Sequence, residues 1–555
     1  MSYEKAFKNL GMEPKAYAKK FAIPIIAFGF IFSILLFALL PTLFTGTTKL
    51  VPVLIPVVCI VFAFSYPLSI LAAKASRIDN NMHYYITQMG SIATAETPRI
   101  DIVRIVSENE DYEELAEETK KIYDLVTVWH MSLAEACRFT SKRTPSIIFE
   151  DFLDRFAHAL QSGEDVKTFL FAEQNVVMNE YEAMYNGALY TVEVIKELFV
   201  SLIMSLIFMA SFAVIMPVIT GMNAELLMGI VVLIFLVTDA VMLMFTKSKI
   251  PKDPAWSRSK NITENKLKLY RSVPISITGC IVVLIAVKLW GILYTPIETS
   301  IAVAMVLTPL IYTGHVSRKI EKAIRRKDEN FPAFIRSLGS SAGARGGVID
   351  EALKALRAHD FGPLTRDVDS LYKMLVTRID KFSSWDYFSA NTGSNLIQRF
   401  SGMFVQATNL GGQPEVIGDI IATNFHRIVT LRKKRSQSSG SLVGVLYGLT
   451  GGIGFTMYIS LGVVGLMQEM FTSVEMPAGM SMGMILYTNV GSIDTLSNMV
   501  LAIMVGHSLM SALLIRIVDG GHMLSATTDF VIMVWISGAS AVVTMAGVSS
   551  LLGLS

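Results

Sequence analysis

The chain has 555 residues, of which 52% are hydrophobic and 17% are charged, whereas roughly a quarter of the residues are charged in an ordinary soluble domain. With a mean hydropathy of +0.50, this composition excludes a disordered chain, a coiled coil and a simple soluble protein. It indicates an integral membrane protein with sizeable water-exposed parts. Three cysteines are too few for a disulfide framework or for a cysteine-rich metal or iron–sulfur site.

Nine stretches are apolar over the roughly 20 residues that a membrane-spanning helix needs. They are residues 21–45, 50–73, 198–222, 226–246, 273–295, 299–316, 441–466, 496–516 and 530–553. The first is too long for the apolar part of a signal peptide and no clear A-x-A site follows it, so we expect an uncleaved helix. The sequence therefore predicts an all-α polytopic membrane protein with about nine transmembrane helices.

Basic residues in the loops predict the orientation of these helices, because Lys and Arg are retained on the cytoplasmic side. The N-terminal stretch carries five lysines before the first span, which predicts a cytoplasmic N-terminus and a multi-pass protein of the cytoplasmic membrane. Nine crossings then place residues 74–197, 247–271 and 315–440 inside. The predicted outer segments contain one Lys, Lys49, and no Arg.

Five consecutive regions follow from this topology. They are residues 1–73, the N-terminus with a first helix pair; 74–197, a first cytoplasmic domain; 198–316, four membrane helices with the cytoplasmic loop 247–271; 317–440, a second cytoplasmic domain; and 441–555, three membrane helices. Each cytoplasmic domain has about 120 residues, enough for an independent helical bundle. Apolar residues at helical spacing, such as Phe152, Phe156 and Leu160, and no sustained alternation predict that both are all-α.

The two cytoplasmic domains resemble each other at a nearly constant shift of about 249 residues. The matches are Asn81 with Asn330, Gly90-Ser91 with Gly339-Ser340, Phe152 and Phe156 with Phe400 and Phe404, and Gly163 with Gly412. Because both copies face the cytoplasm, we interpret this as a direct repeat of two homologous helical bundles. Many transporters instead contain inverted repeats.

The charges of the two copies are opposite. Residues 74–197 contain 12 Lys or Arg and 22 Asp or Glu, a net charge of −10, whereas residues 315–440 contain 20 and 12, a net charge of +8. The loop 247–271 adds a net charge of +6. The two domains therefore cannot present equal surfaces to one partner.

This arrangement resembles the type II secretion F-domain superfamily, the membrane platform proteins of type IV pilus-like machines. The resemblance rests on two homologous helical cytoplasmic domains, each leading into a membrane helix, and it covers most of the chain. Bacterial members usually have three membrane helices. The expanded layout here, the Lys-rich N-terminus and the glycine-rich segment 339–347 are most similar to the archaeal branch and its archaellum platform proteins. A platform of an archaeal adhesive pilus or secretion system is the near alternative.

The resemblance implies a protein that is not an enzyme and has no cofactor. It implies a homodimer in the cytoplasmic membrane, between a hexameric secretion ATPase and a helical filament, in contact with other cytosolic motor components. Such a platform couples the ATPase to insertion of pilin-like (archaellin) subunits and, in the archaellum, supports rotation. The chain itself has no G-x-x-x-x-G-K-[ST] phosphate loop, so any ATP-driven work must come from a partner.

Basic residues of the second cytoplasmic domain and its flanks form the predicted docking surface for the ATPase, because charge complementarity accelerates association and fixes its register. They are Arg318, Lys322, Arg325, Arg326, Arg345, Arg432, Lys433, Lys434 and Arg435. The alternative is that these juxtamembrane residues only hold the topology or touch anionic headgroups. Nucleic-acid binding is disfavoured, because the clusters are juxtamembrane and lack interleaved aromatic residues.

Asp239 and His507 are the candidate polar sites inside the membrane. A charge near the centre of a membrane helix costs about 3 kcal/mol on insertion scales, so Asp239 needs a partner or a watery environment. One interpretation is a proton path or a packing switch, and the other is a hydrogen bond to a neighbouring helix.

The predicted outer segment 467–495 is rich in methionine and has no Lys or Arg. Methionine surfaces adapt to varied apolar partners, which makes Met476, Met480 and Met482 candidate contacts for a pilin-like subunit or the filament base. The alternative is a re-entrant or interfacial segment packed against lipid.

Two other function classes have less support. A polytopic transporter would have polar residues or broken helices at mid-membrane, and Asp239 with the glycine-rich stretch 444–465 is the only support. An intramembrane enzyme would need paired catalytic groups, and Asp239 has no second Asp at comparable depth. The eight His residues form no H-x-x-x-H or H-E-x-x-H pair, so no metal site is predicted.

Overall fold

The computed structural model describes residues 7, 13–39, 50–220, 222–257, 263–293, 298–473 and 493–551. These residues form helices, and their only extended pairing is an isolated bridge between Trp256 and Ser394. This confirms the all-α fold class. The predicted methionine contacts Met476, Met480 and Met482 lie outside the described residues.

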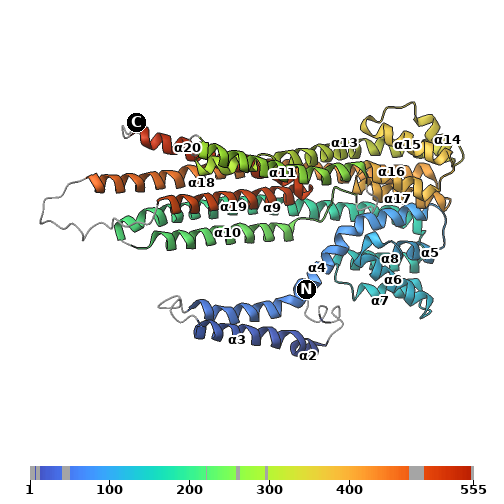
Figure 1. The fold of residues 1–555 in the computed structure, drawn as a ribbon. Helices are drawn as coiled ribbons and strands as arrows, with labels where there is room; N and C mark the ends of the chain where they lie inside the picture. Colours follow the sequence, from blue (N-terminus) through green and yellow to red (C-terminus); the bar gives the residue numbers. More distant parts are fainter. Residues whose placement is uncertain are drawn as a thin grey trace. The chain divides into compact units, whose positions relative to one another are not determined.

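The described helices follow one another along the chain as labelled in Figure 1. The N-terminal part contains α2 (Pro14–Tyr17), the π-turn η1 (Ala18–Ala22), α3 (Ile23–Leu39), α4 (Leu50–Ala93), α5 (Arg99–Ser107), the 3-10 turn η3 (Glu110–Tyr112), α6 (Glu114–Thr127), α7 (Leu133–Ser141), α8 (Ile147–Ser162), α9 (Val166–Thr220), α10 (Ala224–Lys249) and α11 (Glu264–Leu293). The remainder contains α12 (Thr299–Leu307), α13 (Leu310–Gly343), α14 (Ile349–Leu356), the 3-10 turn η4 (Gly362–Leu364), α15 (Thr365–Val376), α16 (Lys381–Thr392), α17 (Asn395–Asn409), α18 (Pro414–Ser473), α19 (Ile493–Asp519), the 3-10 turn η5 (Met523–Ser525) and α20 (Ala526–Leu551).

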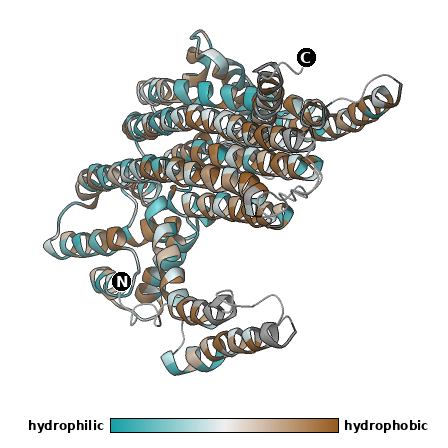
Figure 2. Cartoon of the chain, turned by 90° about the vertical axis from the view of Figure 1, so that its left-hand side faces the viewer, coloured by the Kyte–Doolittle hydropathy of each residue, from teal (hydrophilic) through white to brown (hydrophobic). Residues whose placement is uncertain are grey.

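Among the described residues, seven helices are long and apolar enough to cross a membrane, or eight if α12 and α13, bent by 43° at their junction, form one span. These helices coincide with eight of the nine predicted spans. The first predicted span, residues 21–45, overlaps α3, and its residues 40–45 lie outside the described ranges, so it stays a prediction. Figure 2 shows hydrophobic residues along much of these helices. Many of their side chains are exposed, including Phe208, Met244 and Ile292.

Four of these helices join an apolar stretch to a charged one without a break. They are α4, α9, α13 and α18, with 44, 55, 34 and 60 residues. At 1.5 Å per residue, α18 alone is about 90 Å long, roughly three times the thickness of the hydrocarbon core. Each of the four therefore extends well outside the bilayer.

The chain divides into two compact units. Unit 1 contains residues 1–183 and 403–420, and unit 2 contains residues 184–402 and 421–555. The boundaries of the five regions predicted from sequence do not follow these units and remain a prediction.

Unit 1 has an aromatic core formed by α4, α8 and the start of α9. Tyr85 makes edge-on contacts with Phe149 and Phe152, whose centroids both lie 6.1 Å from its own. Phe152 stacks on Phe156, and both contact Phe169. The helical spacing of Phe152 and Phe156 thus marks a buried face, as the sequence predicted.

Unit 2 contains the core of the membrane helices and a second aromatic cluster. Apolar residues of α9, α10, α18, α19 and α20 share one buried core, which includes Phe199, Phe235 and Met457. Phe331 of α13 and Phe400 of α17 both contact Phe425 of α18, with ring centroids at 4.7 and 5.3 Å. The matched residues Phe152 and Phe400 are therefore both fully buried.

The repeat extends to local hydrogen bonds. Ser146 accepts the backbone N–H of Phe149 at the start of α8 and donates its hydroxyl to Asp79, while Ser394 accepts that of Ile397 at the start of α17 and donates to Asp328. Asp79 and Asp328 are 249 residues apart. This shared cap supports the interpretation of the sequence matches as a direct repeat.

One match is displaced by a residue. Gly163 ends α8 with a φ of +75°, and the glycine with the equivalent backbone at the end of α17 is Gly411, with a φ of +91°. The residue after each glycine donates its N–H to a carbonyl oxygen of the helix, Glu164 to Ala159 and Gly412 to Ala407. The structural partner of Gly163 is therefore Gly411 and not Gly412, because only one glycine of the pair adopts the left-handed conformation that closes a helix.

Candidate functional site

A network of charged side chains lies in unit 2, where the apolar stretches of α13, α18, α19 and α20 meet charged sequence. On α13 the apolar stretch ends at Val316, and Arg318, Lys319 and Glu321 follow at once. On α19 and α20 the corresponding charges are Arg516, Asp519 and Asp529. Helices crossing a bilayer end in this way because charges are expelled to its edge. The four helices therefore bring charges of both signs to the same level.

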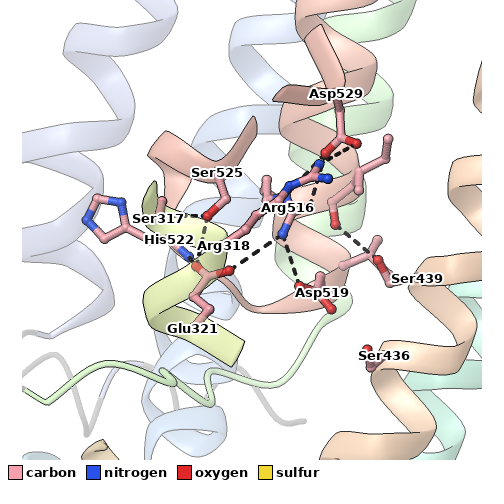
Figure 3. Close-up of polar contacts among 12 residues, drawn as sticks. Ser317, Arg318, Glu321, Ser436, Ser439, Arg516, Asp519, His522, Ser525 and Asp529 are labelled. Carbon is pink, nitrogen blue, oxygen red and sulfur yellow. Dashed lines mark hydrogen bonds and ion pairs between the residues drawn. The ribbon is translucent and has the colours of Figure 1, made fainter. Parts of the chain in front are cut away.

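Arg516 and Asp529 form the centre of this network (Figure 3). The guanidinium of Arg516 lies 3.1 Å from the Asp529 carboxylate and 3.2 Å from that of Asp519. Asp529 is 2% exposed. It also forms an ion pair with Arg318 at 2.6 Å and accepts a hydrogen bond from the hydroxyl of Tyr447 at 2.7 Å. One buried carboxylate thus joins α13, α18, α19 and α20.

Glu321 connects α13 to the turn between α19 and α20. Its carboxylate accepts the backbone N–H of His522 at 2.5 Å and the hydroxyl of Ser525 at 3.0 Å. Arg516 lies 3.8 Å away. One turn further along α13, Arg325 binds Asp519 at 2.7 Å and donates to Ser436 of α18 at 2.8 Å. These contacts fix the register of α13 against its neighbours.

Arg432 of α18 forms the second centre. Its guanidinium binds Asp253 through two nitrogens, at 2.8 and 2.5 Å, and Asp328 of α13 through the third, at 3.1 Å. Asp328, which lies beyond the apolar part of α13, is fully buried. Burial raises the pKa of Asp328 to about 6, although the charge of Arg432 and the hydrogen bond from Ser394 oppose the rise. Arg432 therefore favours the ionised form of this carboxylate.

Arg435, one turn further along α18, caps the end of α19. It donates to the carbonyl oxygens of Val518 at 2.6 Å and Ile517 at 2.9 Å, where the helix leaves its last carbonyls unpaired. Gly520 closes α19 with a φ of +76°, and a Cβ there would lie 2.8 Å from the Arg435 guanidinium carbon. Only glycine fits both the backbone and this close approach.

The predicted docking residues separate into two groups. Arg318, Arg325, Arg432 and Arg435 are turned into the network and bind within unit 2. The other five are exposed: Lys322, Arg326, Arg345, Lys433 and Lys434. Arg345 lies in the turn that ends α13, where Gly346 and Gly347 have positive φ, so the glycine-rich segment 339–347 is a helix end and a helix–helix turn.

The site residues predicted from the sequence do not include Glu321, Arg516, Asp519 and Asp529. A usable signal was present, since each lies at the charged end of a predicted membrane helix and three of them oppose the basic excess there. Within the described ranges, no group of three or more His, Cys, Asp and Glu side chains is placed to hold a metal ion. The arrangement can therefore join helices through ion pairs and hydrogen bonds.

The two polar residues predicted inside the membrane lie together. His507 Nδ1 of α19 is 3.0 Å from Asp239 Oδ2 of α10, and both side chains are at most 1% exposed. The ring of Phe199 stacks on His507, and Ser511 lies 3.4 Å from His507 Nε2. Asp239 thus has the partner in a neighbouring helix that one of the two interpretations requires.

Comparisons with known proteins identify the family of the chain. The family model for protein F of the type II secretion system matches residues 85–214. The flagella accessory protein J (FlaJ) of Methanocaldococcus jannaschii is 36% identical over 99% of this chain and 98% of its own. The chain belongs to the FlaJ family. The FlaJ of Methanococcus voltae is also 36% identical, over 98% of each chain. No solved structure matches the chain.

Membership of the FlaJ family confirms the resemblance found in the sequence. A FlaJ chain with this fold is an integral membrane protein of archaellum assembly and motility. The type II secretion family and the FlaJ relatives indicate an assembly protein of the membrane.

Proposed function

We propose that this protein is the membrane platform on which a hexameric ATPase drives insertion of archaellin-like subunits into a filament, and that the same assembly supports rotation. The observation that carries the proposal is the identity of 36% over nearly the whole chain to two flagella accessory proteins. The continuous helices α9, α13 and α18 give the proposal a physical route. Movement of their charged ends is transmitted into the membrane helices, because a helix is stiff along its axis and the ion-pair network fixes α13 against α18, α19 and α20.

Complementation tests this function. A strain of Methanococcus voltae that lacks its own FlaJ and expresses this chain is expected to regain filaments and swimming. The variant Gly520→Val tests whether the network must be intact, because a β-branched residue is strained at a φ of +76°. This variant is expected to restore neither filaments nor swimming. Normal membrane levels of this chain without any filament, in a host that is rescued by its own gene, would contradict the proposal.

The orientation of the chain is part of the proposal, with the N-terminus and both large charged regions in the cytoplasm of a cytoplasmic-membrane protein. Single cysteines test it after Cys59, Cys137 and Cys280 are replaced by Ala. An impermeant maleimide added to intact cells is expected to label Glu225→Cys, at the exposed start of α10, and not Gln161→Cys, at the exposed end of α8. The reverse pattern would invert the topology.

The ATPase is proposed to dock on the exposed basic residues and not on the arginines of the network. Lys322 and Arg326 are one turn apart on α13 and therefore share a face, and neither forms an ion pair within the described part of the chain. Arg345, Lys433 and Lys434 extend this surface. A homodimer would present it twice, and the other cytosolic motor components would meet the acidic residues 74–197.

Charge reversal tests the docking surface. The variant Lys322→Glu/Arg326→Glu is expected to weaken co-purification of the ATPase by about tenfold or more at low salt, with less difference at high salt, because exposed charges are screened. Lys354→Glu/Arg366→Glu is the matched control, as both side chains are exposed on the same region and the charge changes equally. Equal binding by the two variants at low salt would place the docking surface elsewhere.

A further inference from the structure

The turn between α6 and α7 in unit 1, together with α7 itself, exposes large apolar side chains. Val128 is 68% exposed, Trp129 73% and Phe139 40%. Several other apolar side chains of this bundle are buried, with Leu115, Ile122 and Phe149 at 2% or less, whereas Ile147 at the start of α8 is 70% exposed. Trp is seldom left so exposed on a soluble surface, and clustered exposed apolar residues mark a surface that something covers.

The position of Lys74 places this turn along the membrane normal. Residues 59–73 of α4 contain no charge, and Lys74 is the first charged residue after them. It therefore lies at the edge of the hydrocarbon core, where a charged side chain reaches the headgroups. Lys74 lines one hollow of 610 Å³ together with Trp129, Phe139 and Arg143. The exposed aromatic residues are therefore at headgroup level.

The side chains around the turn are less acidic than the region that carries them. Residues 74–197 have a net charge of −10, whereas the hollow contains Lys74, Lys121 and Arg143 against Glu118 and Asp124, and Lys142 is exposed beside it. Glu118 is bound by Lys74 at 2.9 Å and Lys121 at 2.8 Å. The Arg143 guanidinium lies over the Phe139 ring at 3.5 Å. Trp beside Lys and Arg is the composition that anchors proteins at a membrane interface.

We propose that the α6–α7 turn docks on the surface of the bilayer, with Val128 and Trp129 at the boundary between headgroups and acyl chains and with Lys142 and Arg143 on anionic headgroups. A lipid surface fits better than a protein partner, because the patch lies level with the end of a membrane span and combines an interfacial aromatic residue with basic charge. The contact ties the α6–α7 side of the first bundle to the membrane. This inference does not depend on the proposed ATPase or filament.

A fluorophore beside the patch tests the proposal in the full chain. Thr127→Cys, exposed next to Val128, carries an environment-sensitive nitrobenzoxadiazole label in a background where Cys59, Cys137 and Cys280 are Ala. The matched control is Gln161→Cys, also exposed. It lies fifteen residues beyond Ser146 along the α8 axis, about 22 Å of helix. Both proteins are reconstituted into vesicles of phosphatidylcholine and phosphatidylglycerol, with or without brominated acyl chains.

The label at Thr127→Cys is expected to be blue-shifted and quenched by the brominated lipid, and the label at Gln161→Cys is expected to stay aqueous and unquenched. Adding Val128→Ser and Trp129→Ser, which removes only exposed side chains, should abolish most of the quenching. Adding Lys142→Glu and Arg143→Glu should reduce it in vesicles with phosphatidylglycerol. A label at Thr127→Cys as aqueous as that at Gln161→Cys, in vesicles without any other protein, would overturn the proposal and leave a protein partner as the occupant.

Discussion

Replacing Arg432 by Met is expected to lower the free energy of unfolding by about 3–5 kcal/mol, the usual effect of removing one partner of a buried ion pair. Arg432 serves two carboxylates, Asp253 and Asp328, whose side chains are 4% and 5% exposed. Without Arg432 both carboxylates stay largely buried and lose the ion pair that compensates their burial. Unfolding in mixed micelles with a rising fraction of SDS, followed by tryptophan fluorescence, measures the change.

Lys433 provides the matched control, because it is the next residue on α18 and also forms an ion pair, with Glu329 at 2.9 Å. The two side chains of that pair are 60% and 44% exposed, and exposed pairs contribute less than about 1 kcal/mol. Lys433→Met should therefore unfold almost as the native protein does. The triple variant Arg432→Met/Asp253→Asn/Asp328→Asn should recover much of the loss. Equal destabilisation by Arg432→Met and Lys433→Met would show that burial does not govern this site.

The membrane helices and the repeat were predictable because their signals are local. An apolar run of about 20 residues reports its own environment, and the matches around Phe152 and Phe400 reflect packing that each bundle repeats with the same side chains. The first predicted span stays a prediction, because its residues 40–45 lie outside the described ranges. The one-residue error at Gly412 arose because sequence shows two adjacent glycines and only backbone geometry shows which one closes the helix.

The direction of each basic side chain was not predictable. Arg325 and Arg326 are adjacent on α13, yet Arg325 reaches Asp519 and Arg326 is exposed, because successive residues of a helix point about 100° apart. Which of the two side chains meets a partner depends on the position of α19, which follows nearly 200 residues further along the sequence. The acidic residues that bind the arginines of the network lie on α13, α19 and α20 and in the segment between α10 and α11, so no spacing along the chain could reveal the network.

Replacing His507 by Leu is expected to destabilise the membrane core by about 2–3 kcal/mol, since it leaves Asp239 as an unpaired carboxyl at a depth where such a charge costs about that much. The site cannot recruit water easily, because Asp239 and His507 are at most 1% exposed and α10 packs closely along α19. Asp239→Leu should cost less, because a neutral imidazole is easier to bury than a carboxylate. The SDS titration used for Arg432 measures both changes.

The double variant Asp239→Leu/His507→Leu separates the two roles that the sequence left open. If the pair only joins α10 to α19, the double variant should be more stable than His507→Leu, because hydrogen bonds between membrane helices contribute only about 0.6 kcal/mol on average and no unpaired polar group remains. It should then restore filaments and swimming in the complemented strain, which is the result we expect. A double variant that is as stable as the native protein and reaches the membrane, yet supports no filament, would require a role for the carboxyl and imidazole groups themselves. Proton transfer between α10 and α19 would then be the mechanism to examine, with Ser511 as the next hydrogen-bonding group toward Arg516 along α19.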